Sequence, residues 1–335
     1  MVKLAIDIMG GDHAPLEIIK GVDIALARFD DLELILFGDA DIIKRNLQAT
    51  ERVKIVHAPE KIDMGEKDPI SAVRRNREVS LVQTFQAVRD GEAAGAVTAG
   101  PTQGVVAAAH MIVRRIKGMK RTALCPNLPN LDGKTRILLD VGANLELRSE
   151  HILQLAQYAT IYMREVRGIE RPLVGLMNIG TEPGKGRELE KETYELLEAN
   201  PHVNFHGNVE GKEILSSPCD ILITDGFTGN MLMKAFEGTV RAVGDFFKTE
   251  IKKSFARKIG YLFMRGVFDK FKKKFSADEI GGANLFGVDG VIVKAHGSSD
   301  GYAFSNAIAQ ARKTVRGDVI AKMKKVIEEE GIGLE

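Results

Sequence analysis

The sequence predicts an α/β fold with a large, mostly parallel sheet flanked by helices. Short runs rich in β-branched and other apolar residues alternate with longer stretches of helical periodicity along almost the whole chain. This alternation is typical of strand–helix–strand units, in which helices cover both faces of a parallel sheet. No Pro- or Ser-rich linker and no internal repeat interrupts the 335 residues. We therefore expect residues 1–335 to form a single α/β unit.

Nine apolar runs are expected to form buried strands. In chain order they are Leu4–Ile8, Leu34–Phe37, Val53–Val56, Ala96–Thr98, Ile137–Val141, Leu173–Asn178, Asn204–His206, Ile221–Thr224 and Val291–Lys294. Helical periodicity between the strands marks Leu16–Arg28, Val79–Arg89, Val105–Ile116, Glu150–Arg164 and Leu189–Leu197. Many strands run into Gly-rich turns. Because ligands of open α/β sheets bind at the carboxyl ends of strands, the functional site is expected at these turns.

Composition places the chain among ordinary soluble globular proteins. Lys plus Arg number 47, Asp plus Glu number 46, and 44% of the residues are hydrophobic, which excludes a disordered or fibrous chain. Cys125 and Cys219 stand far apart without a CxxC motif, so neither a disulfide framework nor a structural zinc site is expected. Asp7 falls where a signal peptide needs an apolar run, and no run of ~18 uncharged apolar residues follows. We expect a reduced, cytoplasmic, soluble protein.

The segment from Phe246 to Phe275 breaks this composition. It holds ten basic and two acidic residues and seven of the 15 Phe. Apolar residues recur in it at helical spacing, with Arg and Lys between them: Phe255, Ile259, Leu262, Phe263 and Val267. One interpretation is a solvated basic face with a core or dimer seam. The other is a basic amphipathic helical excursion that contacts anionic lipid. The two are compatible, and nucleic acid is disfavoured because no nucleic-acid module accompanies the basic run.

Nucleotide and hydrolase motifs are missing or incomplete. Neither a Walker A loop nor a GxGxxG fingerprint occurs, which disfavours a classical nicotinamide enzyme. Gly297–Gly301 matches GxSxG, but a nucleophile elbow needs a histidine later in the chain, and His296 is the last one. Ser298 and Ser299 are instead expected to supply turn and N-cap hydroxyls, which could also bind an anion.

Two Gly-rich loops are candidates for anion binding. Gly180–Gly186 follows an apolar strand and precedes a helical pattern, so we expect its N–H groups to face outward at the positive end of a helix dipole. Lys185 would add a mobile positive charge; the alternative is a turn with a solvated lysine. In Asp225–Asn230, Asn230 either caps the helical pattern that it opens or donates its amide hydrogen to an oxyanion. Spacing leaves both roles open.

Nine short blocks follow one order and spacing from residue 1 to beyond residue 300. They are Asp7–Pro15, Ala72–Arg75, Arg115–Gly118, Leu139–Asn144, Val174–Leu176, Gly180–Glu182, Thr224–Asn230, Gly281–Ala283 and Lys294–Gly297. Together the blocks resemble the phosphate acyltransferases of bacterial phospholipid synthesis, the PlsX family. Each block alone is a weak signal, whereas the set is highly specific.

The resemblance implies a fold like that of isocitrate and isopropylmalate dehydrogenases, used without nicotinamide or any other cofactor, and a homodimer. It implies transfer of a long-chain fatty acyl group from acyl carrier protein to inorganic phosphate, giving acyl phosphate. It also implies peripheral attachment to the membrane, where a glycerol 3-phosphate acyltransferase takes over the acyl group. In the family, the excursion resembling residues 246–275 is linked with dimer and membrane contact.

The resemblance also implies roles at both Gly-rich loops. Lys185 is expected to steer phosphate, and Asn230 to donate to the oxyanion that forms when phosphate attacks the thioester. His296 is expected to ligate phosphate or assist protonation of the leaving thiolate, or else to be structural. Contacts with phosphate or substrate are expected from Gly10, Gly11, Gly180, Thr181, Thr228, Gly229 and Ser298. Asp12 and His13 match the N-terminal signature without an assigned role, and no metal site is expected.

The chain departs from the family pattern at Thr98–Gly104. Pro101 stands where most members have an amide residue and lacks a backbone donor; Gln103 replaces a glycine at a position expected to favour positive φ. Arg114 also replaces a small residue. These departures motivate one alternative, a catalytically lapsed, membrane-associated paralogue. A shared acceptor and a related fold motivate the other, a phosphotransacetylase-like acyl-CoA:phosphate acyltransferase.

Overall fold

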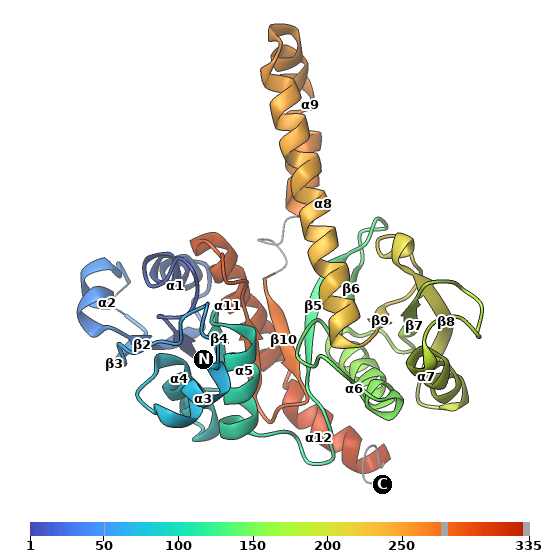
Figure 1. Cartoon of the computed structure of the whole chain (residues 1–335). Coiled ribbons are helices and arrows are strands. Elements are labelled where there is room, and N and C mark those ends of the chain that lie inside the picture. The colour runs from blue at the N-terminus through green and yellow to red at the C-terminus, as the bar shows by residue number, and fades with distance from the viewer. Residues whose placement is uncertain (50, 276–280, 331–335) are drawn as a thin grey trace.

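The computed structural model describes residues 1–49, 51–275 and 281–330. Over these residues an eleven-stranded sheet runs through the molecule in the order β3-β2-β1-β4-β11-β10-β5-β6-β9-β7-β8 (Figure 1). The strands are β1 (Val2–Asp7), β2 (Leu32–Gly38), β3 (Val53–His57), β4 (Gly95–Thr98), β5 (Ala123–Pro129), β6 (Thr135–Leu139), β7 (Leu173–Asn178), β8 (Asn204–Glu210), β9 (Ile221–Ile223), β10 (Ala283–Phe286) and β11 (Val291–Lys294).

Helices flank the sheet along its whole length. They are α1 (Leu16–Arg28), α2 (Ala40–Asn46), α3 (Pro69–Arg75), α4 (Ser80–Arg89), α5 (Thr102–Ala108), the π-helix η1 (Ala109–Val113), α6 (Ser149–Arg167), α7 (Glu188–Ala199), the 3₁₀ turn η2 (Gly211–Glu213), α8 (Gly226–Lys252), α9 (Phe255–Phe275), α11 (Gly301–Arg316) and α12 (Val319–Glu330). The helix expected over Val105–Ile116 is divided, because α5 passes into η1 and Arg114 then takes a positive φ of 72°.

The sheet has two parallel halves, which we call the first and second lobe. β3, β2, β1, β4 and β11 are parallel to one another in the first lobe, and β6, β9, β7 and β8 are parallel in the second. β10 and β5 join the lobes through antiparallel pairings. The predicted mostly parallel sheet is confirmed, and strands lie at all nine expected runs. The pattern missed β5, which contains Pro126 and Pro129, and β10, which has only four residues.

Alternation along the strands explains why helices cover both faces. In β1, Leu4 and Ile6 pack with Phe304 of α11 on one face, whereas Ala5 packs with Phe85 of α4 on the other. Successive side chains of a strand point to opposite faces, so a strand between two helical layers is apolar at every position rather than at alternate ones. In the second lobe, α6 and α12 contribute to another core with β6, β7 and β9.

A long helical hairpin, α8 with α9, projects from the sheet (Figure 1). Its helical structure begins at Gly226, well before the compositional break at Phe246, and turns at residues 253–254. The two helices pack antiparallel through aromatic rings, since the Phe236 and Phe275 ring centroids lie 6.5 Å apart and those of Phe247 and Phe268 lie 5.5 Å apart.

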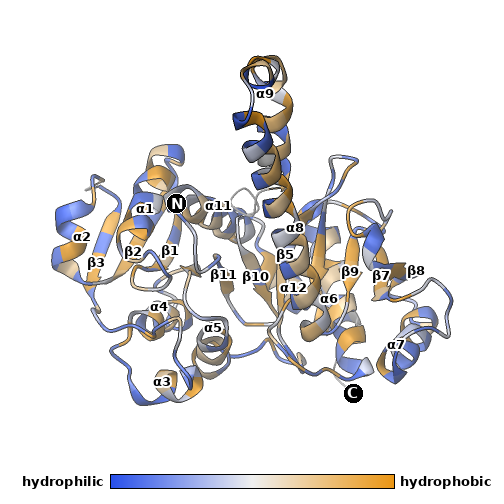
Figure 2. Cartoon of the chain, turned by 45° about the horizontal axis from the view of Figure 1, so that its top comes forward, coloured by the Kyte–Doolittle hydropathy of each residue, from blue (hydrophilic) through white to orange (hydrophobic). Residues whose placement is uncertain are grey.

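The outer part of this hairpin leaves apolar side chains in solvent, and Figure 2 shows hydrophobic and hydrophilic residues intermixed along it. Phe255, Leu262 and Phe263 are 78%, 68% and 87% exposed, and Ile259 and Val267 are exposed as well. Within the described residues, none of the helices combines the length and apolar character needed to cross a bilayer.

Candidate functional site

Three loops of the first lobe meet at the carboxyl ends of β1, β4 and β11. Asp12 N–H donates to Gly297 O at 2.8 Å, which joins the loop after β1 to the loop after β11. Gly11 has a φ of +114°, and a Cβ at this position would lie 3.0 Å from the Ala99 Cβ. Glycine is needed here because the backbone is left-handed and the β4 loop is in close contact. The signature glycines therefore let three strand ends approach one another.

A buried carboxylate holds these loops in place. Asp7, at the end of β1, accepts hydrogen bonds from Ser80 Oγ and Thr98 Oγ1, both at 2.6 Å, and from Met9 N–H at 3.2 Å. Burial raises the pKa of Asp7, and these hydrogen bonds oppose the shift. Since its acceptors are occupied by groups of the protein, Asp7 is a structural anchor for the loop.

The second lobe contributes the loop after β6 and the first turn of α8. Asp140 accepts hydrogen bonds from Leu124 N–H at 2.9 Å, Ala143 N–H at 3.0 Å and Asn144 N–H at 2.8 Å. A Cβ added to Gly229 would lie only 2.0 Å from the Asp140 carbonyl oxygen. The glycines of the Thr224–Asn230 block thus allow α8 to start directly on the β6 loop.

The first turn of α8 rules out one of the two roles left open for Asn230. Asp225 is the N-cap residue and accepts from Thr228 N–H at 2.8 Å. Asn230 lies inside the helix, so the capping role is wrong. Its side chain faces the β6 loop, because a Cβ on Gly142 would lie 3.4 Å from Asn230 Cγ.

Arg187 connects the Gly180–Gly186 loop to α8, and the sequence analysis missed it. Its guanidinium pairs with both Glu190 and Asp225 and lies 3.4 Å from Thr228 Oγ1. Burial raises the pKa of Asp225, but the Thr228 N–H and the Arg187 guanidinium outweigh it, so that pKa lies below its usual value. Glu190 and Asp225 in turn raise the pKa of Arg187. The one sequence feature that could have indicated Arg187 is its position directly after the Gly-rich loop.

The Gly180–Gly186 loop presents Lys185 differently from the expectation. α7 starts at Glu188, and the Arg187 N–H before it already donates to the Glu190 carboxylate at 2.7 Å. The N–H group just before the helix is therefore occupied by a carboxylate of the protein, while anion binding by the loop stays a prediction. Lys185 is half exposed and lies 4.0 Å from Glu182. Asn178 Nδ2 donates to Lys185 O at 3.0 Å, which holds the loop shape.

His296 of the first lobe contacts α8 of the second. Lys234 Nζ lies 3.0 Å from His296 Nε2 and 3.0 Å from Glu237 Oε2. Because an ammonium only donates, Nε2 is assigned as the acceptor. Nδ1 lies 2.8 Å from Ser298 Oγ and also faces the Ser298 N–H at 3.3 Å. Ser298 thus orients the imidazole. Neither Ser298 nor Ser299 is an N-cap, since Asp300 caps α11 and accepts from Ala303 N–H at 2.8 Å.

Several charges surround His296. Burial and the positive charges of Lys234 and Lys294 lower its pKa. The carboxylates of Glu237 and Asp12 oppose this shift. Burial and Lys234 likewise lower the pKa of Lys294, to about 8. The lowered pKa favours the neutral form of the imidazole, whose Nε2 faces Lys234 Nζ. Lys234, Glu237 and Lys294 were not predicted from the sequence.

α8 connects two groups of residues, which we call the Asn230 cluster and the His296 cluster. Asn230 and Lys234 are four residues apart, so they lie on one face of the helix about 5–6 Å from each other. Asn230 contacts the β6 loop and Lys234 contacts His296. Gly10, Gly11, Asp12 and Ser298 lie on the loops of the His296 cluster, and Thr228 and Gly229 lie in the first turn of α8 beside Asn230. Gly180, Thr181 and Lys185 lie on the loop after β7, which reaches α8 through the contact of Arg187 with Thr228. His13 is exposed at the start of α1, where its carbonyl accepts from Glu17 N–H at 3.2 Å.

Two of the three departures from the family pattern fit the backbone. Pro101 has a φ of −63°, which matches its ring, at the N-cap of α5. Gln103 lies within α5, so the expectation that this position favours positive φ is wrong. Arg114, by contrast, has a φ of 72° and a ψ of 170°, a conformation that glycine adopts at the least cost. In the part of the chain that the structure describes, no group of three or more His, Cys, Asp or Glu is placed to hold a metal ion.

Comparison with known proteins supplies independent information. A family model described as "Fatty acid synthesis protein" matches residues 2–322. A phosphate acyltransferase of Acholeplasma laidlawii is 49% identical over 329 residues, covering 98% of each chain. A phosphate acyltransferase of Staphylococcus aureus strain MRSA252 is 45% identical and covers 98% of this chain and 99% of its own.

Solved structures of lower identity show the fold. A branched-chain phosphotransacylase from Enterococcus faecalis has a TM-score of 0.60 at 15% identity, covering 94% of this chain and 99% of its own. A phosphotransacetylase from Streptococcus pyogenes has a TM-score of 0.56 at 16% identity, covering 98% and 94%. The 4-hydroxythreonine-4-phosphate dehydrogenase from Klebsiella pneumoniae scores 0.53 at 12% identity, covering 94% and 99%. The predicted dehydrogenase-like α/β fold is confirmed.

Proposed function

Because this chain belongs to the family of phosphate acyltransferases, a family of fatty acid synthesis proteins, we propose how its site carries out acyl transfer. The resemblance found in the sequence is confirmed, and the protein is an acyltransferase that moves an acyl group onto phosphate for phospholipid synthesis. We propose that the donor is a long-chain acyl-[acyl carrier protein]. The product is an acyl phosphate, an activated ester that a downstream glycerol 3-phosphate acyltransferase consumes.

The reaction forms one bond and breaks one. A phosphate oxygen attacks the thioester carbonyl carbon, the carbonyl oxygen becomes an oxyanion, and the C–S bond then breaks to release a thiolate that takes a proton. No covalent enzyme intermediate is needed, because phosphate is already anionic and a thiolate leaves readily. The protein therefore contributes mainly by positioning the reactants and stabilising charge.

One observation supports this function best: the same face of α8 carries Asn230 from one cluster and the Lys234–His296 pair from the other. We assign Asn230 as the donor to the oxyanion. Lys185 steers phosphate from the neighbouring loop, while neutral His296 orients the Lys234 ammonium. We assign Lys234 as the proton donor to the leaving thiolate, which modifies the protonation role expected for His296 itself.

Release of free carrier from palmitoyl-[acyl carrier protein] tests the function. We expect release to require phosphate and to be faster than with acetyl-CoA, the donor expected for the phosphotransacetylase-like alternative. Lys185→Ala should raise KM for phosphate about ten-fold, because it removes a charge that attracts an anion. His296→Ala should instead lower kcat. Lys191→Ala, a half-exposed lysine on α7, is the matched control.

Three results would contradict these assignments. Preference for acetyl-CoA would favour the short-chain enzyme, and absence of acyl phosphate from either donor would favour the lapsed paralogue. If Lys185→Ala kept the wild-type KM for phosphate, Lys185 would not steer phosphate.

The outer hairpin supports a second proposal, that the protein is a cytoplasmic homodimer attached peripherally to the membrane. Phe255, Leu262 and Phe263 are exposed, and the same segment is rich in Lys and Arg. An apolar face flanked by cations is suited to the head-group region of anionic lipid. Further exposed apolar residues of the hairpin, such as Phe246 at 63% exposure, are available for a second copy of the chain.

Replacing Leu262 and Phe263 by Glu is expected to abolish co-sedimentation with vesicles containing anionic lipid. The change removes exposed apolar side chains from the outer hairpin and adds negative charges that anionic lipid repels. Each effect weakens binding to the interface. Leu196→Glu, a partly exposed leucine on α7, should bind vesicles like the wild type. Unchanged sedimentation of the double variant would refute the membrane contact.

A further inference from the structure

A strongly basic surface lies outside the site described above. Residues 114–121 contain five cations and no acid, and the cationic residues are exposed. With Arg148, at the start of α6, they form what we call the basic surface: Arg114, Arg115, Lys117, Lys120, Arg121 and Arg148. Two carboxylates lie close to it in sequence, Glu146 and Glu150, and Glu150 is 3.7 Å from Arg148. Along the chain the cations therefore outnumber the acids by three to one. Asp289, whose N–H donates to Arg114 O at 2.9 Å, also lies at the edge of this surface and pairs with Lys324.

The backbone beneath the basic surface is fixed. Gln154 of α6 donates through Nε2 to Gly118 O at 2.8 Å and accepts from Lys120 N–H at 2.7 Å. Arg115 forms a β-bridge with Val288, next to β10. The cations are thus presented from a tethered loop rather than from a freely moving one, which reduces the entropy lost when a partner binds.

The positive charges of the basic surface act on two nearby histidines, His110 and His151. Burial, followed by the cations Arg121, Arg148 and Lys120, lowers the pKa of His151, with Glu150 opposing. Burial and the cations Arg115 and Arg121 likewise lower the pKa of His110. Residues from η1, the 114–121 loop and the start of α6 therefore share one positive field.

The basic surface adjoins the candidate site. Asn144 Nδ2 donates to Thr122 O at 2.6 Å, directly after Arg121, and Asn144 N–H donates to the Asp140 carboxylate at 2.8 Å. The same β6 loop carries Gly142, which packs against Asn230. Leu145, the next residue after Asn144, is 70% exposed. An exposed apolar side chain, three residues before Arg148, thus lies on the loop that packs against the proposed oxyanion donor.

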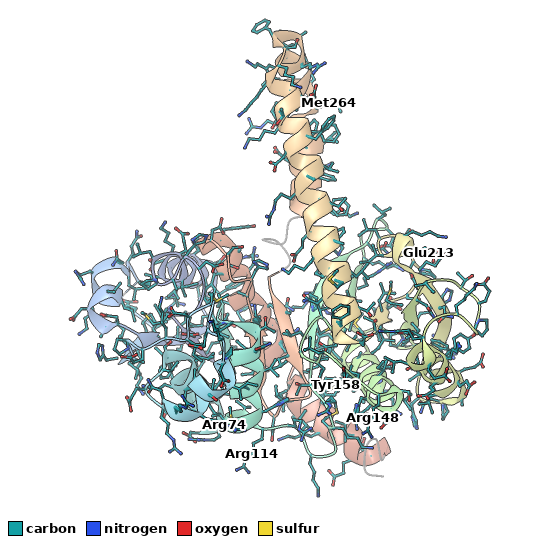
Figure 3. All side chains as sticks on the ribbon, in the orientation of Figure 1. Arg74, Arg114, Arg148, Tyr158, Glu213 and Met264 are labelled. Atoms are coloured by element: carbon teal, nitrogen blue, oxygen red, sulfur yellow. The ribbon has the colours of Figure 1, made fainter. Side chains whose placement is uncertain are left out.

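The basic surface and the hairpin tip lie at opposite ends of the molecule. In Figure 3, Met264 lies in the upper part of the hairpin, whereas Arg114 and Arg148 lie at the lower edge of the body. A membrane that contacts the hairpin tip would leave the basic surface pointing away from the lipid. Its position therefore favours a soluble anionic partner over a bilayer.

We propose that the basic surface docks the acidic protein that delivers the acyl thioester, with Leu145 as the apolar contact beside the site entrance. This inference rests on the proposed function, which makes a carrier protein the acyl donor. Complementary charge accelerates encounter and sets orientation. The proximity to the β6 loop places the carried thioester near Asn230.

The test compares two matched double charge reversals in the full-length protein. Lys120→Glu with Arg121→Glu reverses the basic surface; Lys44→Glu with Arg45→Glu reverses an exposed Lys-Arg pair on α2, at the far end of the first lobe. With palmitoyl-[acyl carrier protein], we expect the first variant to show a KM for the donor raised by about ten-fold or more. The second should keep the wild-type KM.

A protein-free donor separates docking from chemistry. With palmitoyl-N-acetylcysteamine, a neutral thioester, the Lys120/Arg121 variant should turn over at the wild-type rate. Its KM for the carrier-bound donor should also depend less on salt than that of the wild type. An unchanged KM for the carrier-bound donor would overturn the docking proposal while leaving the proposed function intact. Loss of anionic-vesicle binding without a change in KM would assign the surface to lipid instead. A wild type that uses only the protein-free donor would overturn both.

Discussion

Asn230→Ala is expected to lower kcat by about 10²–10³-fold, the usual cost of removing one preorganised oxyanion donor, with little change in KM for phosphate. The physical reason is that the amide hydrogen bond strengthens only as charge develops on the carbonyl oxygen. The fold should persist, because alanine is a better helix former than asparagine inside α8. Steady-state rates of acyl phosphate formation, measured against both substrates, would provide the two parameters.

Thr239→Ala is the matched control for the Asn230 experiment. It removes a polar side chain from the same helix at an exposed position, where Thr239 Oγ1 donates only to Ala235 O at 2.8 Å. Its kinetics should equal those of the wild type. If Asn230→Ala raised KM for phosphate and left kcat unchanged, Asn230 would be a ground-state phosphate ligand rather than an oxyanion donor.

Gly229→Ala is expected to destabilise the protein by about 3 kcal/mol or more and to lower Tm by roughly 5 °C. The added Cβ would lie 2.0 Å from the Asp140 carbonyl oxygen and 3.0 Å from Thr224 Cγ2. The start of α8 must then move away from the β6 loop. Because Asn230 is the next residue, we also expect activity to fall by at least the factor caused by Asn230→Ala. Calorimetry and the carrier-release assay measure the two effects.

Gly238→Ala offers a sharp comparison on the same helix. Nothing lies within 4 Å of a Cβ built at Gly238, so alanine meets no steric barrier. Removing a glycine from a helix interior stabilises it by about 1 kcal/mol, and Tm should stay constant or rise. Equal Tm values for the Gly229 and Gly238 variants would show that close contact between α8 and the β6 loop does not limit the choice of residue.

Much of the fold could be predicted because it depends on local patterns. Strand β7 and helix α1 have the predicted bounds, since each is an apolar pattern that ends at clear breaks. Strand β5 was missed because its prolines obscure the pattern, and its place in the sheet comes from pairing with β10 and β6. The start of the hairpin was missed because α8 begins on a Gly-rich turn that resembles a loop.

The site was only partly predictable. The Gly-rich turns mark where strands end, and the blocks that resemble the family mark Lys185, Asn230 and His296. The structure adds Arg187 between two carboxylates and Lys234 on His296. The contacts of Arg187 and Lys234 could not be predicted from the sequence, because surface arginines and lysines are common and most of them are solvated.

Local order along the chain determined the alternation of strands and helices, the glycines at close approaches, and the basic aromatic composition of the hairpin. These features depend on neighbouring residues, whose spacing is visible without a fold. Packing alone decided that α8 crosses from one lobe to the other and sets Lys234, 62 positions earlier in the chain, against His296. The energy of such a contact depends on distance and burial in three dimensions, which the linear order of residues does not contain.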